Sequence, residues 1–277
     1  MLSRAGVAEK QPTMDAKTLL ESGKLSAAVE QLSQDVRAHP VDSRRRTFLF
    51  ELLCLTGDYE RAGRQLDVIA QQNPETETGI EVYRGILAAE KARARLTSDG
   101  LMPDFLLKPP PFAILHLEAV NRLREGHAAE ARGLLEKAAE SETPAGGRAD
   151  GEAFADFSDQ DAVLGCLLEL FLHDRYVWIP FVHIKHLSIS APKKLRDLIW
   201  IPAALETIEG PVGGVFIPVL YRDSWRHAND QVRLGRMTDW QALGEGLVGG
   251  MGQRVFFVDE GEKAILELRE LEFGVAR

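Results

Sequence analysis

Hydrophobic positions recur with helical spacing through the first half of the chain, in three similar segments, 19–40, 53–74 and 122–144. Each has a glycine, an alanine five residues later, a leucine four residues after that, and a final proline. These are Gly23, Ala28, Leu32 and Pro40, then Gly57, Ala62, Leu66 and Pro74, then Gly126, Ala131, Leu135 and Pro144. The first two glycines are 57 − 23 = 34 residues apart and the third is 126 − 57 = 69 further on. A period of 34 is typical of tetratricopeptide helix pairs, so we predict TPR-like hairpins with the glycine in the turn.

Between the second and third segments, the apolar spacing over 77–96 predicts one long helix. The residues that follow include Pro103 and three consecutive prolines at 109–111, which exclude a helix and favour an extended crossing. This insert is apolar for a loop. We expect it to pack on the helices, with an exposed partner surface as the alternative.

The pattern changes in the second half of the chain. Residues 141–155, rich in glycine, alanine and charge, are typical of a flexible linker. A weak capping box at Ser158 and Asp161 then predicts a buried helix over 159–173. Short β-branched and aromatic runs predict strands at 178–183, 198–201, 214–219 and 254–259, with 264–273 closing a hairpin across 260–262.

Together these patterns predict an α+β protein, in which an N-terminal all-α TPR-like array precedes a C-terminal α/β module with short strands. The expected divisions are a disordered or non-native extension at 1–14, the helical repeats at 15–144, a linker at 145–155 and the C-terminal module at 156–277. Met14 is the expected natural start, because the helical pattern begins just after it.

Composition narrows the function. The net charge of −9 and pI of about 5.4 disfavour nucleic acid as the main partner. No apolar stretch reaches the roughly 18 residues of a membrane span, and the N-terminus has no apolar signal-peptide core, so we expect a cytoplasmic protein. Cys54 and Cys166 each lie in an apolar run, where free buried thiols are common; a disulfide between them stays open.

Three motifs invite a chemical interpretation, and each has a simpler one. Residues 244–249 match G-x-G-x-x-G, but a strand rather than a helix is expected to follow, so turns or close packing are favoured over nucleotide binding. His183 and His186, with His173 upstream, point to opposite faces of a strand, which disfavours a metal site. The aspartates at 156, 159 and 161 are explained by the dipole of the predicted helix.

The densest polar cluster is Arg233, Arg236 and Asp239, beside Trp240. It is expected to form a buried ion network, and the alternative is a small-molecule or enzymatic site that docks a carboxylate, with Trp240 as a stacking wall. Tryptophan twice precedes proline by two residues, which predicts anchors at strand ends. The full set of candidate structural or interaction residues is Trp178, Pro180, Asp197, Trp200, Pro202, Tyr221, Arg233, Arg236, Asp239 and Trp240.

Four ordered motifs also resemble a known family: DLIWIPA at 197–203, LYRDS at 220–224, RLGRMTDW at 233–240 and GMGQR at 250–254. They are similar to the ImpE family, also called TagJ, and the resemblance extends over about residues 15–277. It implies a non-enzymatic accessory protein of bacterial type VI secretion, without a cofactor. Such a protein would bind the N-terminal helix of the small sheath subunit and modulate assembly or disassembly of the contractile sheath. The family offers no residue motif for that contact, and self-association as a scaffold stays open.

Overall fold

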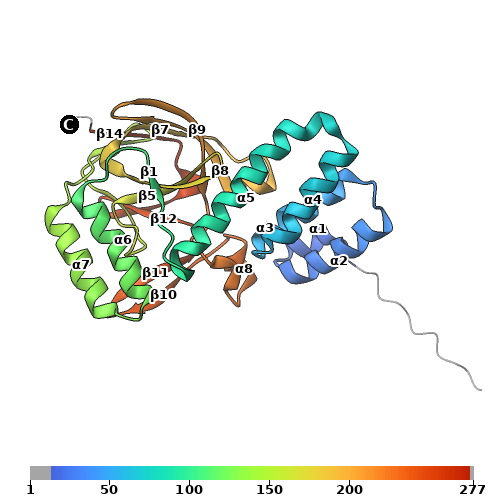
Figure 1. Ribbon diagram of the computed structural model, residues 1–277, viewed down its shortest axis with the longest axis horizontal. Coiled ribbons are helices and arrows are strands. Elements are labelled where there is room, and N and C mark those ends of the chain that lie inside the picture. Colours follow the sequence, from blue (N-terminus) through green and yellow to red (C-terminus); the bar gives the residue numbers. More distant parts are fainter. Residues whose placement is uncertain (1–13, 275–277) are drawn as a thin grey trace, which may run out of the picture.

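The computed structural model describes residues 14–274, so most of the segment predicted as an N-terminal extension lies outside the described residues (Figure 1). Its first half is helical and its second half is rich in strands, which confirms the predicted α+β class. The helices are α1 (Ala16–Glu21), α2 (Leu25–Ala38), α3 (Ser43–Leu55), α4 (Tyr59–Gln72), α5 (Glu77–Ser98), α6 (Pro111–Arg124), α7 (Ala128–Ser141) and the short α8 (Asp230–Arg233).

The three predicted hairpins are present as α1–α2, α3–α4 and α6–α7. Their turn glycines, Gly23, Gly57 and Gly126, have φ of +72°, +71° and +84°, the left-handed conformation that other residues adopt only with strain. The long helix α5 is also confirmed. On one side of α5 lie the helices α1–α4, and on the opposite side lie the sheet and the hairpin α6–α7 (Figure 1).

The proline-rich insert is extended, as predicted. Its strand β1 (Asp104–Phe105) pairs in parallel with β6 (Arg175–Pro180), and the side chains of Phe105 and Leu106 pack against the core. Helix α6 begins at Pro111, a position where the missing N–H costs no hydrogen bond. The insert therefore belongs to the folded body.

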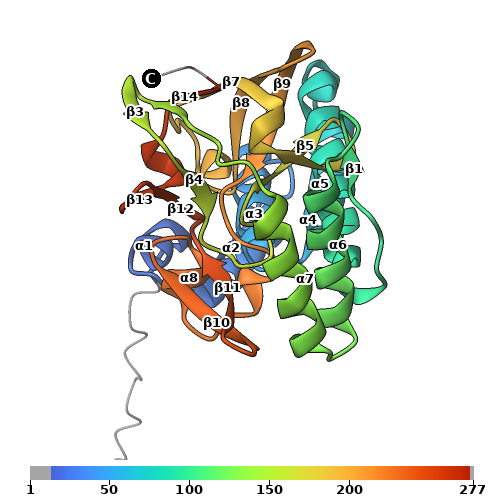
Figure 2. The ribbon, with the colours of Figure 1, turned by 90° about the vertical axis from the view of Figure 1, so that its left-hand side faces the viewer.

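A nine-stranded sheet forms the centre of the second half, in the order β1-β6-β5-β9-β8-β7-β14-β2-β3 (Figure 2). Its remaining members are β2 (Gly147–Ala149), β3 (Glu152–Phe154), β5 (Leu167–Leu172), β7 (Ile184–Ile189), β8 (Trp200–Thr207), β9 (Gly210–Pro218) and β14 (Glu270–Phe273). Two smaller sheets are formed by β4 (Phe157–Asp159), β12 (Val255–Val258) and β13 (Gly261–Ala264), and by β10 (Thr238–Gly244) and β11 (Leu247–Gly252).

The helix predicted at 159–173 is wrong. Its sequence forms the end of β4, a tight turn over 161–165 and the strand β5. A continuous apolar run is equally the pattern of a strand covered on both faces, and β5 is buried along nearly its whole length. The expected capping box is absent. The Asp161 carboxylate instead accepts the N–H groups of Val163 (2.9 Å) and Leu164 (3.3 Å), and so closes the turn.

The linker predicted at 145–155 is also wrong, because this segment forms β2 and β3. Strand β2 pairs with β14, where Ala149 faces Leu271. A Cβ atom on Gly147 would lie 1.9 Å from the carbonyl oxygen of Glu272, so this glycine serves close strand packing rather than flexibility.

The strands predicted from 178, 214 and 254 are confirmed with shifted ends, whereas the run from 198 becomes a short 3-10 turn and the longer β8. The predicted hairpin over 264–273 needs correction. Strand β12 pairs with β4 and with β13, which ends at Ala264, whereas β14 pairs with β2 and β7. The rings of four phenylalanines pack against one another where β4, β12 and β14 come together: Phe157, Phe181, Phe256 and Phe273.

Candidate functional site

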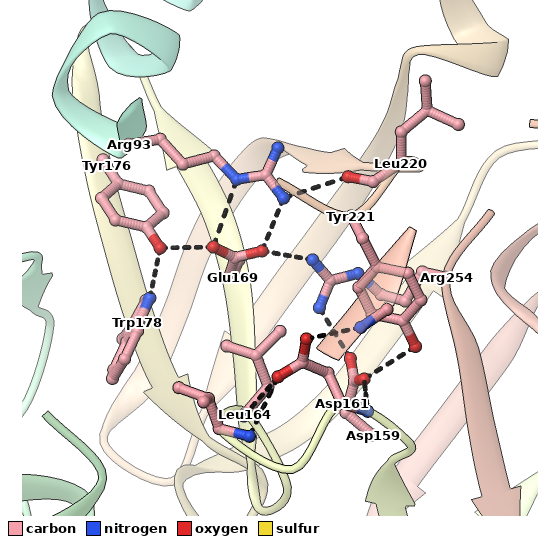
Figure 3. A network of polar contacts seen from close by, with 12 residues as sticks. Arg93, Asp159, Asp161, Leu164, Glu169, Tyr176, Trp178, Leu220, Tyr221 and Arg254 are labelled. Atoms are coloured by element: carbon pink, nitrogen blue, oxygen red, sulfur yellow. Dashed lines mark hydrogen bonds and ion pairs between the residues drawn. The ribbon is translucent and has the colours of Figure 1, made fainter. Parts of the chain in front are cut away.

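A network of buried charges lies where α5, β5 and the start of β12 meet (Figure 3). At its centre is Glu169, which interrupts the apolar strand β5. Its carboxylate accepts hydrogen bonds from Arg93 of α5, at 3.2 Å from Nε and 2.7 Å from Nη2. It also accepts from Arg254 Nη2 and the Tyr176 hydroxyl. Glu169 therefore connects the helical half to two parts of the sheet-rich half.

A second carboxylate, Asp159 at the end of β4, shares Arg254 with Glu169. Arg254 Nη1 donates to Asp159 Oδ2 at 2.7 Å, and the Tyr221 hydroxyl donates to Oδ1 at 2.9 Å. The side chains of Arg254 and Asp159 are 0% exposed. Moving an ion from water into the protein interior costs several kcal/mol. The attraction between Arg254 and its two carboxylate partners offsets this cost.

The two carboxylates have opposite electrostatic environments. Burial opposes ionisation of Glu169, but Arg93 and Arg254 outweigh it and hold the pKa of Glu169 well below its ordinary value. Burial raises the pKa of Asp159 to about 7, with Arg254 only partly opposing it. A pKa near 7 would suit acid–base catalysis, but Asp159 has no access to solvent. The arrangement therefore favours a structural role, in which the buried ion pairs hold α5, β5 and the start of β12 together.

A cavity of 270 Å³ adjoins this network, between α6 and the β10–β11 hairpin. Asp161 lines it, but its carboxylate is already occupied: besides the turn amides, it accepts the N–H of Gly250 at 2.9 Å. A Cβ atom on Gly250 would lie 2.3 Å from the Tyr221 ring. Gly244 and Gly246 have φ of +98° and +78° in the hairpin turn. The third glycine of the match is Gly249, where a Cβ atom would lie 3.3 Å from the Leu243 side chain. The glycines of the G-x-G-x-x-G match thus serve the turn and close packing, as predicted.

The predicted network of Arg233, Arg236 and Asp239 is not formed. Arg236 donates to the carbonyl oxygens of Glu21 (3.1 Å) and Leu20 (3.0 Å) at the end of α1. Asp239 lies at the exposed start of β10, where its Oδ2 is 3.1 Å from His227 Nε2. The three residues separate because the chain turns from α8 into β10 between them.

Arg233, the last residue of α8, forms hydrogen bonds that connect α8 to α2. It donates to Ser26 Oγ at 3.2 Å and to Asp230 Oδ1 at 2.7 Å. Asp230 Oδ2 in turn accepts the N–H of Leu25, the first residue of α2, at 2.8 Å. Together with Arg236, these contacts attach the α1–α2 hairpin to the C-terminal half.

The aromatic candidates are mostly internal. Trp178 donates to the Tyr176 hydroxyl beside the network, and Trp200 donates to Glu90 of α5 at 2.7 Å. Tyr221 belongs to the network itself. Trp240 is 38% exposed, with its ring centroid 6.0 Å from that of Tyr221.

The two prolines and Asp197 occupy turns and strand ends. Pro180 is the last residue of β6. Pro202 lies in β8 just beyond the last pair with β7, Ile189–Ala203, so its missing N–H removes no ladder bond there. Asp197 accepts the N–H groups of Lys193 (2.8 Å) and Lys194 (3.0 Å) and closes the turn that precedes β8.

Sequence reasoning missed Arg93, Glu169 and Arg254, and it assigned Asp159 to a helix terminus. One signal was present. Glu169 is a charged residue inside the apolar run LLELFL, and a charge in a buried strand requires a partner. The sequence gives no indication that this partner lies on α5.

A second hollow, a groove of 840 Å³, separates α5 from β8 and β9. Residues of α5 spaced three and four apart form one wall, and apolar residues of the strands form the other. The lining includes Val82, Gly85 and Ala88 on α5 with Pro202, Val215 and Phe216 on the strands. Val82 is 44% exposed, whereas Glu81, Arg84 and Asp174 supply charge around the groove.

Gly85 determines how narrow this groove becomes at one end. A Cβ atom there would lie 3.0 Å from the carbonyl oxygen of His173, in the β5–β6 turn. The absence of a side chain lets α5 approach that turn and closes the end of the groove.

Within residues 14–274, no helix is long and apolar enough to cross a lipid bilayer.

The sequence and fold have known relatives. The profile of the ImpE protein family matches residues 151–272. The type VI secretion system accessory component TagJ of Pseudomonas aeruginosa is 35% identical over 260 residues, which cover 94% of this chain and 91% of the relative. A crystal structure of a protein from Vibrio parahaemolyticus superposes with a TM-score of 0.87 at 26% identity, covering 94% of this chain and 98% of that one. The chain therefore belongs to the ImpE family.

Proposed function

We propose that this protein is a non-enzymatic accessory component of a bacterial type VI secretion system and acts in the cytoplasm. It binds a helical segment of the small sheath subunit and modulates assembly or disassembly of the sheath. Membership of the ImpE family and the name of the Pseudomonas aeruginosa relative support the accessory role. The sheath partner and the effect on the sheath are what the family resemblance implies.

The groove between α5 and β8–β9 is the observation that carries the binding proposal. An amphipathic helix is recognised by a groove with apolar walls that receive side chains spaced three or four residues apart. Here the walls present Val82, Ala88 and Phe216, whereas Val215, which also lines the groove, is only 1% exposed. Charged residues at the rim can set the direction of a bound helix.

The polar chemistry supports a binding role over catalysis. Glu169 and Asp161 use their carboxylate oxygens on arginines, on Tyr176 and on backbone N–H groups. Arg233 and Arg236, the centre of the alternative small-molecule site, bond to the first two helices. A catalytic role would require groups with free acceptor or donor positions facing a substrate.

The test is a titration of the full-length protein with a fluorescently labelled peptide from the N-terminal helix of the cognate small sheath subunit, read by anisotropy. We expect saturable binding in the micromolar range or tighter. Val82→Asp should weaken it at least about tenfold, because a carboxylate would be buried against the apolar face of the peptide. Absence of binding to both the peptide and the intact subunit would refute the partner.

Val41→Asp is the matched control. Val41 is 81% exposed between α2 and α3, so the same substitution adds the same charge away from the groove. Its affinity should equal that of the wild type. If Val82→Asp also binds like the wild type, the helix binds elsewhere and the groove assignment fails while the partner stands.

A further inference from the structure

Three side chains with metal-ligand atoms meet at a place that the network and the groove do not use. His116 lies on α6, Glu142 directly follows α7 as its C-cap, and Cys166 directly precedes β5. One ligand atom from each lies within 4.8 Å of the other two. His116 and Cys166 are buried and Glu142 is half-buried. Three separate elements thus deliver a nitrogen, an oxygen and a sulfur to one point.

The spacing of the two buried ligands matches a tetrahedral metal centre. His116 Nε2 is 3.5 Å from Cys166 Sγ. In a tetrahedral zinc site, with Zn–N near 2.0–2.1 Å and Zn–S near 2.3 Å, the two ligand atoms lie about 3.5 Å apart. The separation of these two atoms is therefore the one that a tetrahedral ion would require.

The second nitrogen of His116 is already fixed. Its Nδ1 lies 2.6 Å from the carbonyl oxygen of Val163, and a carbonyl can only accept, so Nδ1 carries the proton. Nε2 is then the unprotonated nitrogen that faces Cys166. Metal-binding histidines are oriented in this way, by a backbone carbonyl on the far nitrogen. A Cβ atom on Gly165 would lie 3.1 Å from His116 Cε1, so this glycine lets the turn press against the ring.

Glu142 adds an independent indication. Among the ion pairs of residues 14–274, none joins Glu142 to an arginine or lysine, although its carboxylate is half-buried. The chain leaves the helical conformation at Glu142, with φ of −74° and ψ of 137°. The Glu142 carboxylate instead interacts with the Cys166 thiol, which places its oxygen beside the sulfur.

We propose that His116, Glu142 and Cys166 bind a divalent transition-metal ion, with Zn²⁺ as the preferred ion. A mixed nitrogen, oxygen and thiolate ligand set suits zinc, which binds all three. Three protein ligands leave a fourth position for water or another ligand. The ion would join α6, the end of α7 and the start of β5, and its role is to stabilise the attachment of the α6–α7 hairpin to the sheet.

Metal binding is tested on the full-length protein after treatment with a chelator. Titration with Zn²⁺ against a chromophoric chelator should give one ion per chain. Co²⁺ should produce a thiolate-to-cobalt charge-transfer band and the visible bands of tetrahedral coordination. Both should be lost in Cys166→Ser and kept in Cys54→Ser, which changes the other buried cysteine. Absence of stoichiometric binding by the wild type, or equal binding by Cys166→Ser, would overturn the proposal.

A second variant guards against a folding defect at the buried cysteine. Glu142→Gln keeps the size of a half-buried side chain, and circular dichroism checks that it remains folded. We expect its zinc affinity to fall by more than about tenfold, and we expect zinc to raise the melting temperature of the wild type but not of this variant. Affinity equal to the wild type would remove Glu142 from the ligand set and refute the three-residue site.

Discussion

Arg236 Nη2 donates a hydrogen bond of 3.0 Å to the carbonyl oxygen of Leu20, which lies 216 residues earlier in the chain. The Leu20 carbonyl also accepts the N–H of Gly23 at 2.9 Å, and Arg236 adds a second donor at this helix end, where a cation interacts favourably with the helix dipole. Helix α1 has only six residues, too few to be stable alone. The C-terminal half therefore completes the first helix of the N-terminal half.

We predict that Arg236→Met loosens α1. Amide hydrogen exchange over 16–24 should become faster, corresponding to a local loss of about 1–3 kcal/mol for the two carbonyl bonds. Arg37→Met, an exposed change on α2 of the same hairpin, is the control and should leave this protection unaltered. Unchanged protection in Arg236→Met would show that α1 is held by its apolar contacts alone.

The buried network should be costly to break. Arg254→Met removes the charge that both Asp159 and Glu169 share, and we expect a loss of about 3–5 kcal/mol in the free energy of unfolding, measured with urea. Arg175→Met breaks an exposed pair with Asp104 and should cost no more than about 1 kcal/mol. Equal losses in the two variants would contradict a structural role for the network.

Glu51 should give the stability a measurable pH dependence. Burial raises its pKa from 4.5 to about 6, and Arg196, 3.9 Å away, offsets this only in part. Because the folded-state pKa is raised, the protonated form stabilises the fold. That contribution is complete below pH 4.5 and is lost as the pH rises through 6.

The matching variant is Glu51→Gln, which cannot ionise. Its free energy of unfolding relative to the wild type should increase by about 2 kcal/mol between pH 4 and pH 7.5, since 1.5 pKa units correspond to that amount. Urea unfolding at several pH values measures the difference. A difference that does not vary with pH would mean that Glu51 ionises normally in the folded protein.

Two turn glycines provide a matched pair. Gly57→Ala and Gly126→Ala both force alanine into a left-handed conformation, which costs about 1 kcal/mol. At Gly57 the new Cβ atom would also lie 2.5 Å from the Trp225 ring, whereas at Gly126 nothing lies within 4 Å. We expect Gly57→Ala to lose about 1–3 kcal/mol more in thermal or urea unfolding, from overpacking. Similar losses would indicate that Trp225 moves aside freely.

Local sequence patterns determined much of the fold. The 34-residue spacing of Gly23 and Gly57 identified two helical hairpins, because a turn with positive φ selects glycine wherever it recurs. Prolines correctly marked the extended insert before α6. Runs of β-branched and aromatic residues located the strands β6, β9 and β12. Each of these features depends on residues within a few positions of one another.

The tertiary structure decided what the pattern left ambiguous. The apolar run at 167–172 is compatible with a buried helix or with a strand covered on both faces, and α5 with the neighbouring strands makes it the latter. Likewise, Gly147 indicated flexibility in the sequence, but its place beside Glu272 makes it a packing residue.

The partners of buried polar groups were beyond the reach of the sequence. Glu169 bonds to Arg93 and Arg254, which are 76 and 85 residues away, and Cys166 faces His116 across 50 residues. Periodicity records which face of an element is apolar, because that depends on neighbouring residues. Which charge meets which is fixed only when helices and strands pack, since a buried ion is stabilised by whichever opposite charge the fold brings within a few ångströms.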